Sequence, residues 1–364
     1  MNVTYVYADS LEEWNCSEWR CAVPARAFRR TARHNATMIS IPEFAQNTAQ
    51  AQEACNEADL IVVQRNLFNR VLTMIQHWQA LGKTVIADFD DAYNLIHPTV
   101  KNYKFWMEGK YEVNRDGKVI GEDIITPTPL KQFRWGLQLV HGASVPCRML
   151  AEDWQQLTDM IIVPNYLELS KYGNLPPKNS GDKIIIGWGG SLSHLQSFED
   201  SGVLEALKAV CKARPKVRLM ICGDRRVFDR IMLPAHKKIY QPFVPALEWS
   251  YQIAKFDIGI APLHGEYDKR RSWIKVLEYM IMKVPWIATN YPPYEDLIPY
   301  GKVVQNNPEQ WEQALLEVID HLEDYKHFAR TSAYTFALNQ NIDDNIESII
   351  SSYSKIIDRN TTEH

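Results

Sequence analysis

The chain has 364 residues, of which 46% are hydrophobic and 23% charged, and its formal net charge at pH 7 is −4. This balance is typical of a globular protein of about two domains of ~100–200 residues each. The negative net charge gives no electrostatic case for nucleic-acid binding, and no apolar run approaches the ~18 residues that span a bilayer. The six cysteines have no zinc-ligand spacing, so we expect reduced thiols in a cytoplasmic protein.

Short apolar strands alternate with helical stretches through the first half of the chain. Near-continuous apolar strands separated by helices predict a parallel sheet that is covered on both faces. The chain is expected to open on a strand rather than a signal peptide. The predicted strands are 3–8, 37–41, 59–64, 84–88, 143–145 and 159–163, with helices such as 67–81 and 147–157 between them.

A basic, partly apolar helix is predicted near the start of the chain, from Pro24 to Arg33. Its four arginines allow two interpretations. One is a peripheral contact with anionic lipid at the inner face of a membrane. The other is a solvated helix face, which is the commoner role of such a charge run.

Residues 97–129 interrupt the alternation and are predicted to be an insertion in the first domain. Asp116-Gly117 separates Tyr111-Glu112-Val113 from Lys118-Val119-Ile120, a pattern that indicates a β-hairpin. An inserted loop can bind substrate. The structural alternative is a hairpin that only caps the edge of the sheet.

A polar stretch rich in proline and glycine, 171–182, is the best candidate for a linker. The second series of predicted strands is 183–188, 216–222, 238–241, 256–262, 284–288 and 302–305, with helices near 200–213, 246–255, 273–283 and 308–322 and further helical stretches at 324–337 and 342–358. The sequence therefore predicts two doubly wound α/β domains, 1–173 and 182–338. Ligands of such sheets bind beyond the carboxyl ends of the strands, so a cleft between the domains is the expected site.

The segment Arg270–Met280 combines a basic loop with a mostly apolar helix. Arg271, Lys275 and Glu278 fall on one stripe of it. Charges on a buried helix are costly unless they have partners. A helix start preceded by arginines suits a phosphate, and Glu278, one turn deeper, can accept hydrogen bonds from sugar hydroxyls. The structural alternative is an ordinary Lys–Glu pair.

Glycines and arginines follow three strands of the second domain. Gly189-Gly190-Ser191 could let a phosphate or sugar approach the backbone, but a full G-x-G-x-x-G pattern is missing, so a nicotinamide cofactor is not favoured. Gly223 is followed by Arg225 and Arg226. Together with Arg270 and Arg271, these arginines suit a diphosphate at one edge of the sheet. Phe243 and Val244, after the next strand, either face a nucleobase or merely turn the chain.

Three carboxylates, Asp88, Asp90 and Asp91, lie at the end of a predicted strand of the first domain. A structural role for all three is not expected. They could bind a metal, act as a base, or orient the hydroxyls of an acceptor.

The order of these motifs resembles GT-B glycosyltransferases, of the retaining family-4-like, group 1 type. The matching segments of the second domain are Gly189-Gly190-Ser191, Gly223-Asp224-Arg225, Gln241–Pro245, Phe256–Leu263, Lys275-x-x-Glu278 and Val284-Pro285, and those of the first are Ala58–Arg65, Gly82–Asp91 and Ile162–Asn165. The resemblance implies two Rossmann-like domains facing a cleft. It also implies that the last helix, 342–358, packs back on the first domain.

The function implied by the resemblance is transfer of a sugar from a nucleoside-diphosphate sugar, with UDP expected as the nucleotide. Retention is implied, without an obligatory metal or another cofactor. The acceptor would be a glycan or a lipid-linked glycan, in polysaccharide or glycoconjugate synthesis. Two alternatives stay open: a sugar-nucleotide epimerase of the same build, and a non-catalytic nucleotide-sugar-binding protein.

The resemblance also assigns roles to residues. Glu278 would bind the ribose, and Arg271, Ser272 and Lys275 would face the diphosphate. The first glutamate of the family's Glu-x7-Glu motif falls on Arg270, so either Glu266 or Asp268 substitutes for it or the donor differs. The catalytic set is then Asp90, Asp91 and Arg270, and the donor set is Gly189, Gly190, Ser191, Arg225, Phe243, Val244, Glu266, Arg271, Ser272, Lys275 and Glu278.

Overall fold

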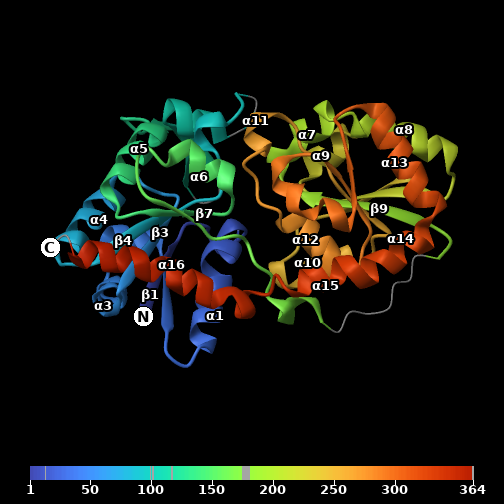
Figure 1. Ribbon diagram of the computed structural model, residues 1–364. Helices are drawn as coiled ribbons and strands as arrows, with labels where there is room; N and C mark the ends of the chain where they lie inside the picture. Colours follow the sequence, from blue (N-terminus) through green and yellow to red (C-terminus); the bar gives the residue numbers. More distant parts are fainter. Residues whose placement is uncertain (13, 99, 101, 116–117, 174–180, 363–364) are drawn as a thin grey trace. The chain divides into compact units, whose positions relative to one another are not determined.

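The computed structural model describes residues 1–12, 14–98, 100, 102–115, 118–173 and 181–362. They form two compact units (Figure 1). The N-terminal unit is Met1–Asn165 together with Ile342–His364, and the C-terminal unit is Tyr166–Asn341. Each unit has one six-stranded parallel sheet with helices around it. The α/β class with two doubly wound parallel sheets is confirmed.

The sheet of the N-terminal unit has the order β2-β1-β3-β4-β7-β8. Its strands are β1 (Asn2–Tyr7), β2 (Asn35–Ser40), β3 (Leu60–Gln64), β4 (Thr84–Asp88), β7 (Ala143–Val145) and β8 (Met160–Ile162). Its α-helices are α1 (Val23–Arg30), α2 (Ile41–Gln46), α3 (Ala49–Glu57), α4 (Arg70–Ala80), α5 (Pro129–Leu139), α6 (Arg148–Trp154) and α16 (Ile342–Thr362), and its short 3-10 or π turns are η1 (Glu18–Ala22), η2 (Tyr93–Leu95) and η3 (Lys104–Glu108).

The sheet of the C-terminal unit has the order β11-β10-β9-β12-β13-β14. Its strands are β9 (Ile184–Gly190), β10 (Val217–Gly223), β11 (Lys238–Gln241), β12 (Ile258–Ala261), β13 (Trp286–Thr289) and β14 (Lys302–Val304). Its α-helices are α7 (Leu195–Asp200), α8 (Val203–Ala213), α9 (Arg225–Arg230), α10 (Trp249–Ile253), α11 (Gly265–Asp268), α12 (Ile274–Ile281), α13 (Pro308–Asp320), α14 (Leu322–Phe328) and α15 (Tyr334–Leu338). Its short turns are η4 (Leu169–Tyr172), η5 (Leu192–His194), η6 (Ala235–Lys237), η7 (Ala246–Glu248), η8 (Pro292–Tyr300) and η9 (Ala329–Ala333).

The strands were predictable because both faces of these sheets are buried. β3 and β4 are buried along their whole length, as the apolar runs require. Every strand predicted in the two series has a counterpart in the structure.

The helix α16 returns to the N-terminal unit. The ring of Tyr353 stacks on Phe28 of α1 with 6.2 Å between centroids, and Asn360 donates to the Thr84 hydroxyl at 3.0 Å. The segment 166–173 lies in the C-terminal unit, whereas the predicted first domain runs to residue 173. Its Leu167 pairs with Asn341 in a parallel bridge, a long-range contact that composition does not reveal.

The basic helix α1 turns its apolar residues inward, since Val23, Ala27 and Phe28 are buried. Its arginines bind groups of this chain. Arg26 pairs with Glu18, and Arg30 pairs with Asp343 of α16 at 2.7 Å. Lipid contact by this helix stays a prediction.

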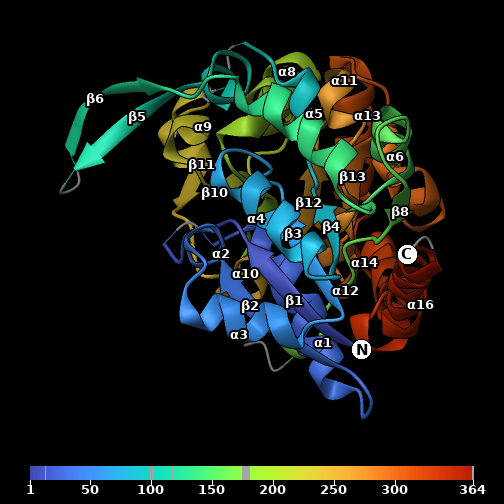
Figure 2. The same ribbon diagram turned by 90° about the vertical axis from the view of Figure 1, so that its left-hand side faces the viewer.

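The insertion has two parts. Trp106 of η3 is buried and stacks on Tyr93 with 3.9 Å between centroids, so the first part belongs to the core of the N-terminal unit. The second part is the predicted hairpin, β5 (Lys110–Arg115) with β6 (Lys118–Ile124), and it is confirmed; the turn at Asp116-Gly117 lies outside the described residues. The hairpin is a separate sheet that extends away from the rest of its unit (Figure 2), so it does not cap the edge of the six-stranded sheet.

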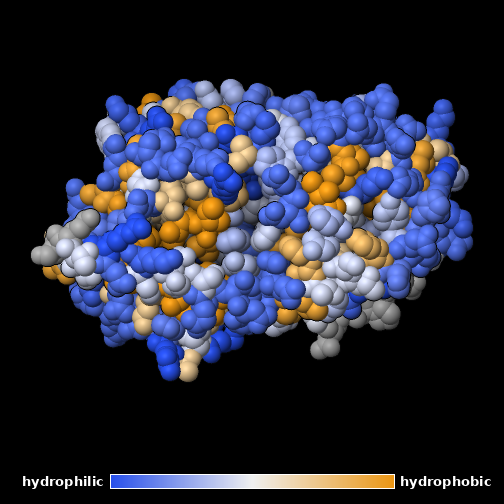
Figure 3. Space-filling view, viewed as in Figure 1, coloured by the Kyte–Doolittle hydropathy of each residue, from blue (hydrophilic) through white to orange (hydrophobic). Residues whose placement is uncertain are grey.

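On the face seen in Figure 3, hydrophobic residues form separate areas over both units, with hydrophilic residues between them. Within the described part of the chain, no helix has the length and apolar character to cross a membrane.

Candidate functional site

The C-terminal sheet reverses its strand order between β9 and β12. In open α/β sheets, ligands bind at such a switch point, outside the carboxyl ends of the strands. Here β9 ends at Gly190 and β12 ends at Ala261. The loops that follow these two strands therefore frame the expected site, and α12 follows the second loop.

Lys275, in the first turn of α12, reaches the end of β9. Its ammonium group donates a hydrogen bond to the Gly189 carbonyl and lies 5.0 Å from the centroid of the Trp188 ring. Desolvation lowers the pKa of Lys275 to about 8, although the Glu278 carboxylate opposes this effect. The ammonium is thus charged at neutral pH, and burial of this charge costs free energy.

Glu278 lies one turn further along α12 and is only 7% exposed. Its carboxylate accepts hydrogen bonds from the Trp249 indole at 3.0 Å and from the Tyr172 hydroxyl at 3.2 Å. Desolvation is the main cause that raises the pKa of Glu278 to about 7. Among the described residues, the Glu278 carboxylate and Lys275 ammonium form no ion pair with each other. The structural alternative of an ordinary Lys–Glu pair is therefore wrong.

Arg271 connects the two loops that frame the switch point. It donates to the Ser193 hydroxyl at 3.2 Å and to the Asp268 carboxylate at 3.1 Å. Asp268 is 3% exposed and also accepts from the Ser197 hydroxyl and from the His264 backbone N–H. This buried carboxylate therefore fixes the direction of Arg271.

Arg270 has a different environment from Arg271. Its guanidinium pairs with the Glu266 carboxylate at 2.8 Å, and Glu266 also pairs with Lys269. Of the two carboxylates proposed to replace the family's first glutamate, Glu266 is therefore bound to Arg270 and Asp268 to Arg271. Ser272 precedes α12, where its hydroxyl accepts a long hydrogen bond from the Ile274 N–H at 3.4 Å.

The glycines at the end of β9 have a packing role that the sequence did not reveal. A Cβ on Gly189 would lie 2.1 Å from the Trp249 ring, and one on Gly190 would lie 2.7 Å from the Trp188 ring. The space that a side chain would occupy at both residues is thus filled by tryptophans of this chain, and the approach of a ligand to their backbone stays a prediction. The Ser191 and Ser193 hydroxyls lie 2.9 Å apart and continue the loop toward Arg271.

The arginines after β10 have partners close to them in the sequence. Arg225 pairs with Asp229 at 2.9 Å, with its guanidinium 4.8 Å from the Tyr240 ring centroid, and Arg226 pairs with Asp224 at 2.6 Å. Both arginines therefore bind carboxylates within their own segment. Arg271 contacts the loop after β9, and the gathering of all four arginines around a diphosphate stays a prediction.

Phe243, after β11, is 64% exposed. A Cβ on Gly223, at the end of β10, would lie 3.3 Å from its ring, so Phe243 stands beside the same edge of the sheet. Val244 next to it is half-buried. An exposed aromatic ring in this position offers a surface on which a nucleobase can stack.

In the N-terminal unit, the three carboxylates at the end of β4 have separate environments. Asp88 is buried and pairs with Arg20 at 2.6 Å, which is a structural role. One oxygen of Asp90 is buried without a hydrogen-bond partner among the described residues. Burial, followed by the charge of Asp91, raises the pKa of Asp90 to about 6. Asp90 and the half-buried Asp91 therefore remain as candidates for chemistry.

No described group of three or more histidine, cysteine, aspartate or glutamate side chains is placed to hold a metal ion. The described residues therefore give no support to metal binding by the Asp88–Asp91 segment.

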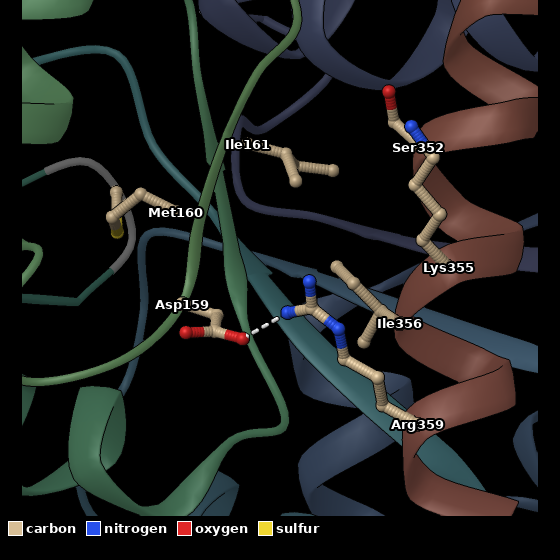
Figure 4. A pocket seen from close by; sticks show the side chains of 7 residues that line it. All are labelled: Asp159, Met160, Ile161, Ser352, Lys355, Ile356 and Arg359. Carbon is tan, nitrogen blue, oxygen red and sulfur yellow. Dashed lines mark hydrogen bonds and ion pairs between the residues drawn. The ribbon is translucent and has the colours of Figure 1, made fainter.

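A pocket of about 330 Å³ lies elsewhere in the N-terminal unit, between α16 and the start of β8 (Figure 4). Arg359 crosses it to pair with Asp159, beside Lys355 and Ile356. The pocket adjoins the amino end of β8, opposite the edge where α/β sheets bind ligands, and none of the predicted site residues lines it.

Sequence reasoning missed three residues at the C-terminal site: Tyr172, His194 and Trp249. Tyr172 and Trp249 reach Glu278 from 106 and 29 residues away. No local pattern signals such contacts. His194 lies three residues after the end of the Gly189-Gly190-Ser191 turn, and its position after a strand was the available signal.

Comparison with known proteins gives a family match within the C-terminal unit. Residues 185–321 match the family model for glycosyl transferases group 1. No curated protein sequence matches the chain.

Several solved structures share the fold over nearly the whole chain. The structure of Anabaena HepE in complex with UDP and glucose is 12% identical, with a TM-score of 0.66, and the match covers 98% of this chain and 100% of HepE. The sucrose-phosphate synthase of Thermosynechococcus elongatus is 9% identical, with a TM-score of 0.66 and coverage of 98% and 99%. A putative UDP-N-acetylglucosamine 2-epimerase from Listeria monocytogenes is 12% identical, with a TM-score of 0.56 and coverage of 97% and 95%.

The predicted GT-B architecture is confirmed by these matches, and the family model covers most of the C-terminal unit, including the loops that frame the switch point. Residues 185–321 therefore form a domain that matches the glycosyl transferases group 1 family, and the chain as a whole has the two-domain GT-B fold.

Proposed function

We propose that this protein is a glycosyltransferase that moves a sugar from UDP-sugar to a glycan or a lipid-linked glycan, with retention, in polysaccharide or glycoconjugate synthesis. The observation that carries the proposal is the pair of titratable side chains on α12, Lys275 and Glu278, which do not neutralise each other. Perturbed groups of this kind cluster at functional sites. They also stand at the switch point of a group 1 domain.

The donor roles follow from charge and position. Lys275 and Arg271 supply positive charge at the ends of β9 and β12, where a diphosphate would lie. Glu278 is an acceptor that can take further hydrogen bonds from ribose hydroxyls, because a carboxylate offers about four lone-pair sites and two are used by Trp249 and Tyr172. Phe243 would stack on the base. UDP is favoured because the structural neighbour HepE was solved with UDP and glucose.

The chemical step then depends on charge stabilisation. As the bond between sugar and phosphate breaks, negative charge grows on the leaving diphosphate. Fixed cations stabilise such charge strongly where water is excluded. Lys275 and Arg271 would supply this stabilisation without an obligatory metal, and Arg270 with its partner Glu266 would lie beside them.

The acceptor roles belong to the N-terminal unit. Asp90 retains a buried, unbonded carboxylate oxygen and a raised pKa, so it can accept a proton or orient a hydroxyl, with Asp91 beside it. A peripheral membrane contact through the basic helix α1 would serve a lipid-linked acceptor. The arginines that already bind Glu18 and Asp343 would need to exchange these partners for lipid.

A panel of nucleotide sugars tests the proposal. The protein is incubated with UDP-, GDP- and ADP-sugars, with and without a glycan acceptor, and the products are separated. Nucleotide released together with a glycosylated acceptor supports transfer. Interconverted donor would show epimerisation instead, and binding without any turnover would show a non-catalytic binder.

The site assignment is tested with Lys275→Ala and Glu278→Ala, which we expect to weaken donor binding. Lys212→Ala and Glu205→Ala are matched controls, because both residues are exposed on α8. Unchanged donor affinity in well-folded Lys275 and Glu278 variants would remove the assignment.

A further inference from the structure

His194 lies at the carboxyl edge of the C-terminal sheet. The donor roles proposed above do not include it. It is the last residue of η5 and follows the loop after β9. Its ring packs edge-on against Trp188 with 6.0 Å between centroids, and a Cβ on Gly190 would lie 3.2 Å from its Cδ2 atom. The ring is therefore held at the switch point by β9 itself.

The Nδ1 atom of His194 is buried and has no hydrogen-bond partner among the described residues. Native proteins leave few buried polar atoms in this condition, and those at ligand edges commonly meet a ligand or water. The orphaned nitrogen is therefore a second indication, besides position, that the ring has a function at this edge.

The charged groups that face His194 are both cations. Arg271 donates to the hydroxyl of Ser193, the residue before it, and Lys275 lies over the Trp188 ring that His194 contacts. The carboxylate in this network, Asp268, is already bound to Arg271. Burial and these two positive charges hold the pKa of His194 well below its ordinary value, so the free protein carries a neutral imidazole.

A diphosphate bound to Arg271 and Lys275 would favour the protonated form of the His194 ring, because its negative charge outweighs the repulsion from the two cations. A proton from solvent would then add to a ring nitrogen, and the imidazolium would donate a hydrogen bond to a phosphate oxygen. Proton uptake would give the site a third cation only while the phosphate is present.

We propose that His194 belongs to the phosphate-binding surface of the donor site and takes up a proton from solvent when a nucleoside diphosphate binds. This inference rests on the proposed function. It goes beyond that function by giving the site a proton-linked phosphate contact.

Calorimetric titration of the full-length protein with UDP, at pH 6.5 in buffers of different ionisation enthalpy, measures the proton uptake directly. We expect uptake in the wild type that is lost in His194→Gln, together with about a tenfold fall in UDP affinity, as for a lost charged hydrogen bond. His236→Gln is the matched control, because His236 is exposed and precedes β11 at the opposite edge of the sheet. Uridine, which lacks phosphate, should bind without uptake that depends on His194.

The outcomes separate the two proposals. Binding of UDP with equal proton uptake in the wild type and in His194→Gln would overturn the role of His194 and leave the proposed function standing. Failure of UDP, GDP and ADP all to bind the wild type would overturn both.

A second measurement covers the case in which His194→Gln does not fold. The ring resonances of His194 in the wild type are followed by NMR as a function of pH, with and without UDP. An upward shift of its pKa on UDP addition supports the inference, and an unchanged titration contradicts it.

Discussion

Both units bury a basic and an acidic side chain at the carboxyl edge of their sheet, but they use them differently. In the N-terminal unit, Arg20 donates two hydrogen bonds to Asp88, at 2.9 and 2.6 Å, and two more to the Val163 carbonyl and the Asn165 side chain, at 2.6 and 2.8 Å. Asp88 also accepts from the Ser144 hydroxyl at 2.5 Å. Each charge has an opposite charge and polar neighbours, so nothing is left for a ligand.

In the C-terminal unit, Lys275 and Glu278 are one turn apart on α12 but bind neutral groups instead of each other. Burial is therefore the largest cause of both shifts, although the charge of each residue opposes the shift of the other, and the pKa values lie at about 8 for Lys275 and about 7 for Glu278. The contrast teaches that burial alone does not mark a functional charge. A buried pair with every hydrogen bond made is structural, whereas a separated pair is available to a ligand that brings the missing charge and hydroxyls.

Breaking the N-terminal pair should have the largest effect. Asp88→Asn leaves the Arg20 guanidinium buried without its counter-charge, so the free energy of unfolding should fall by about 3–5 kcal/mol. Urea denaturation at pH 7 measures this. The exposed Asp358→Asn serves as control, since it removes a carboxylate that faces solvent. A loss below about 1 kcal/mol for Asp88→Asn would show that the pair is not the structural element described here.

The neighbouring Asp90 tests the same contrast within one strand end, because its carboxylate is incompletely bonded where that of Asp88 is saturated. Asp90→Asn should lower the turnover number by about 10²-fold, the lower range for a lost acid–base group, with little change in stability. Wild-type turnover should rise with pH through about 6 as Asp90 loses its proton, and the variant should lack this rise. Equal pH profiles for both proteins would exclude Asp90 from the reaction.

Glu278→Gln and Lys275→Met should weaken UDP binding, whereas Asp88→Asn should weaken folding. Each removes one charged contact to the donor, so UDP affinity should fall by about 10–100-fold, while the free energy of unfolding changes by no more than about 1 kcal/mol. Calorimetry and urea denaturation of the same samples measure both. Large destabilisation with unchanged affinity would place this pair in the same structural class as Arg20 and Asp88.

The pH dependence of UDP binding should show the smallest effect, a change of several-fold. Below about pH 7, Glu278 gains a proton and loses an acceptor, and above about pH 8, Lys275 loses its charge, so affinity should peak between these values. Because the two groups interact, the apparent pKa values of the two limbs describe the coupled pair and not one residue each. Glu278→Gln should abolish the acid limb and keep the basic limb. The profile is read in His194→Gln, where proton uptake by that ring cannot raise affinity at low pH, and a flat profile of this variant between pH 6 and 9 would contradict the titration of the pair.

Much of the fold could be predicted from the sequence, because strands buried on both faces are written as continuous apolar runs, such as Leu60–Gln64 and Thr84–Asp88. The shared helix face of Lys275 and Glu278 could also be predicted, because it depends only on their spacing in the sequence. Their partners were not, because Trp249 and Tyr172 come from distant segments. The structural role of Asp88 was equally hidden, since Arg20 lies 68 residues away in a π-helical turn.

Arginine side chains show the same limit. The sequence placed Arg225, Arg226 and Arg271 after strands of one sheet, which is where they lie. Only the structure shows that the first two bind carboxylates of their own segment, while Arg271 turns toward the loop after β9. Position along the chain follows from hydrophobic periodicity, but the direction of a long side chain depends on the partners that the fold brings to it.

The most direct test of the central claim is a crystal structure of the protein with UDP. The account predicts the diphosphate within hydrogen-bond distance of Lys275 and Arg271, and the ribose hydroxyls on the Glu278 carboxylate. UDP bound elsewhere, with Lys275 still on the Gly189 carbonyl and Glu278 holding only Trp249 and Tyr172, would contradict it.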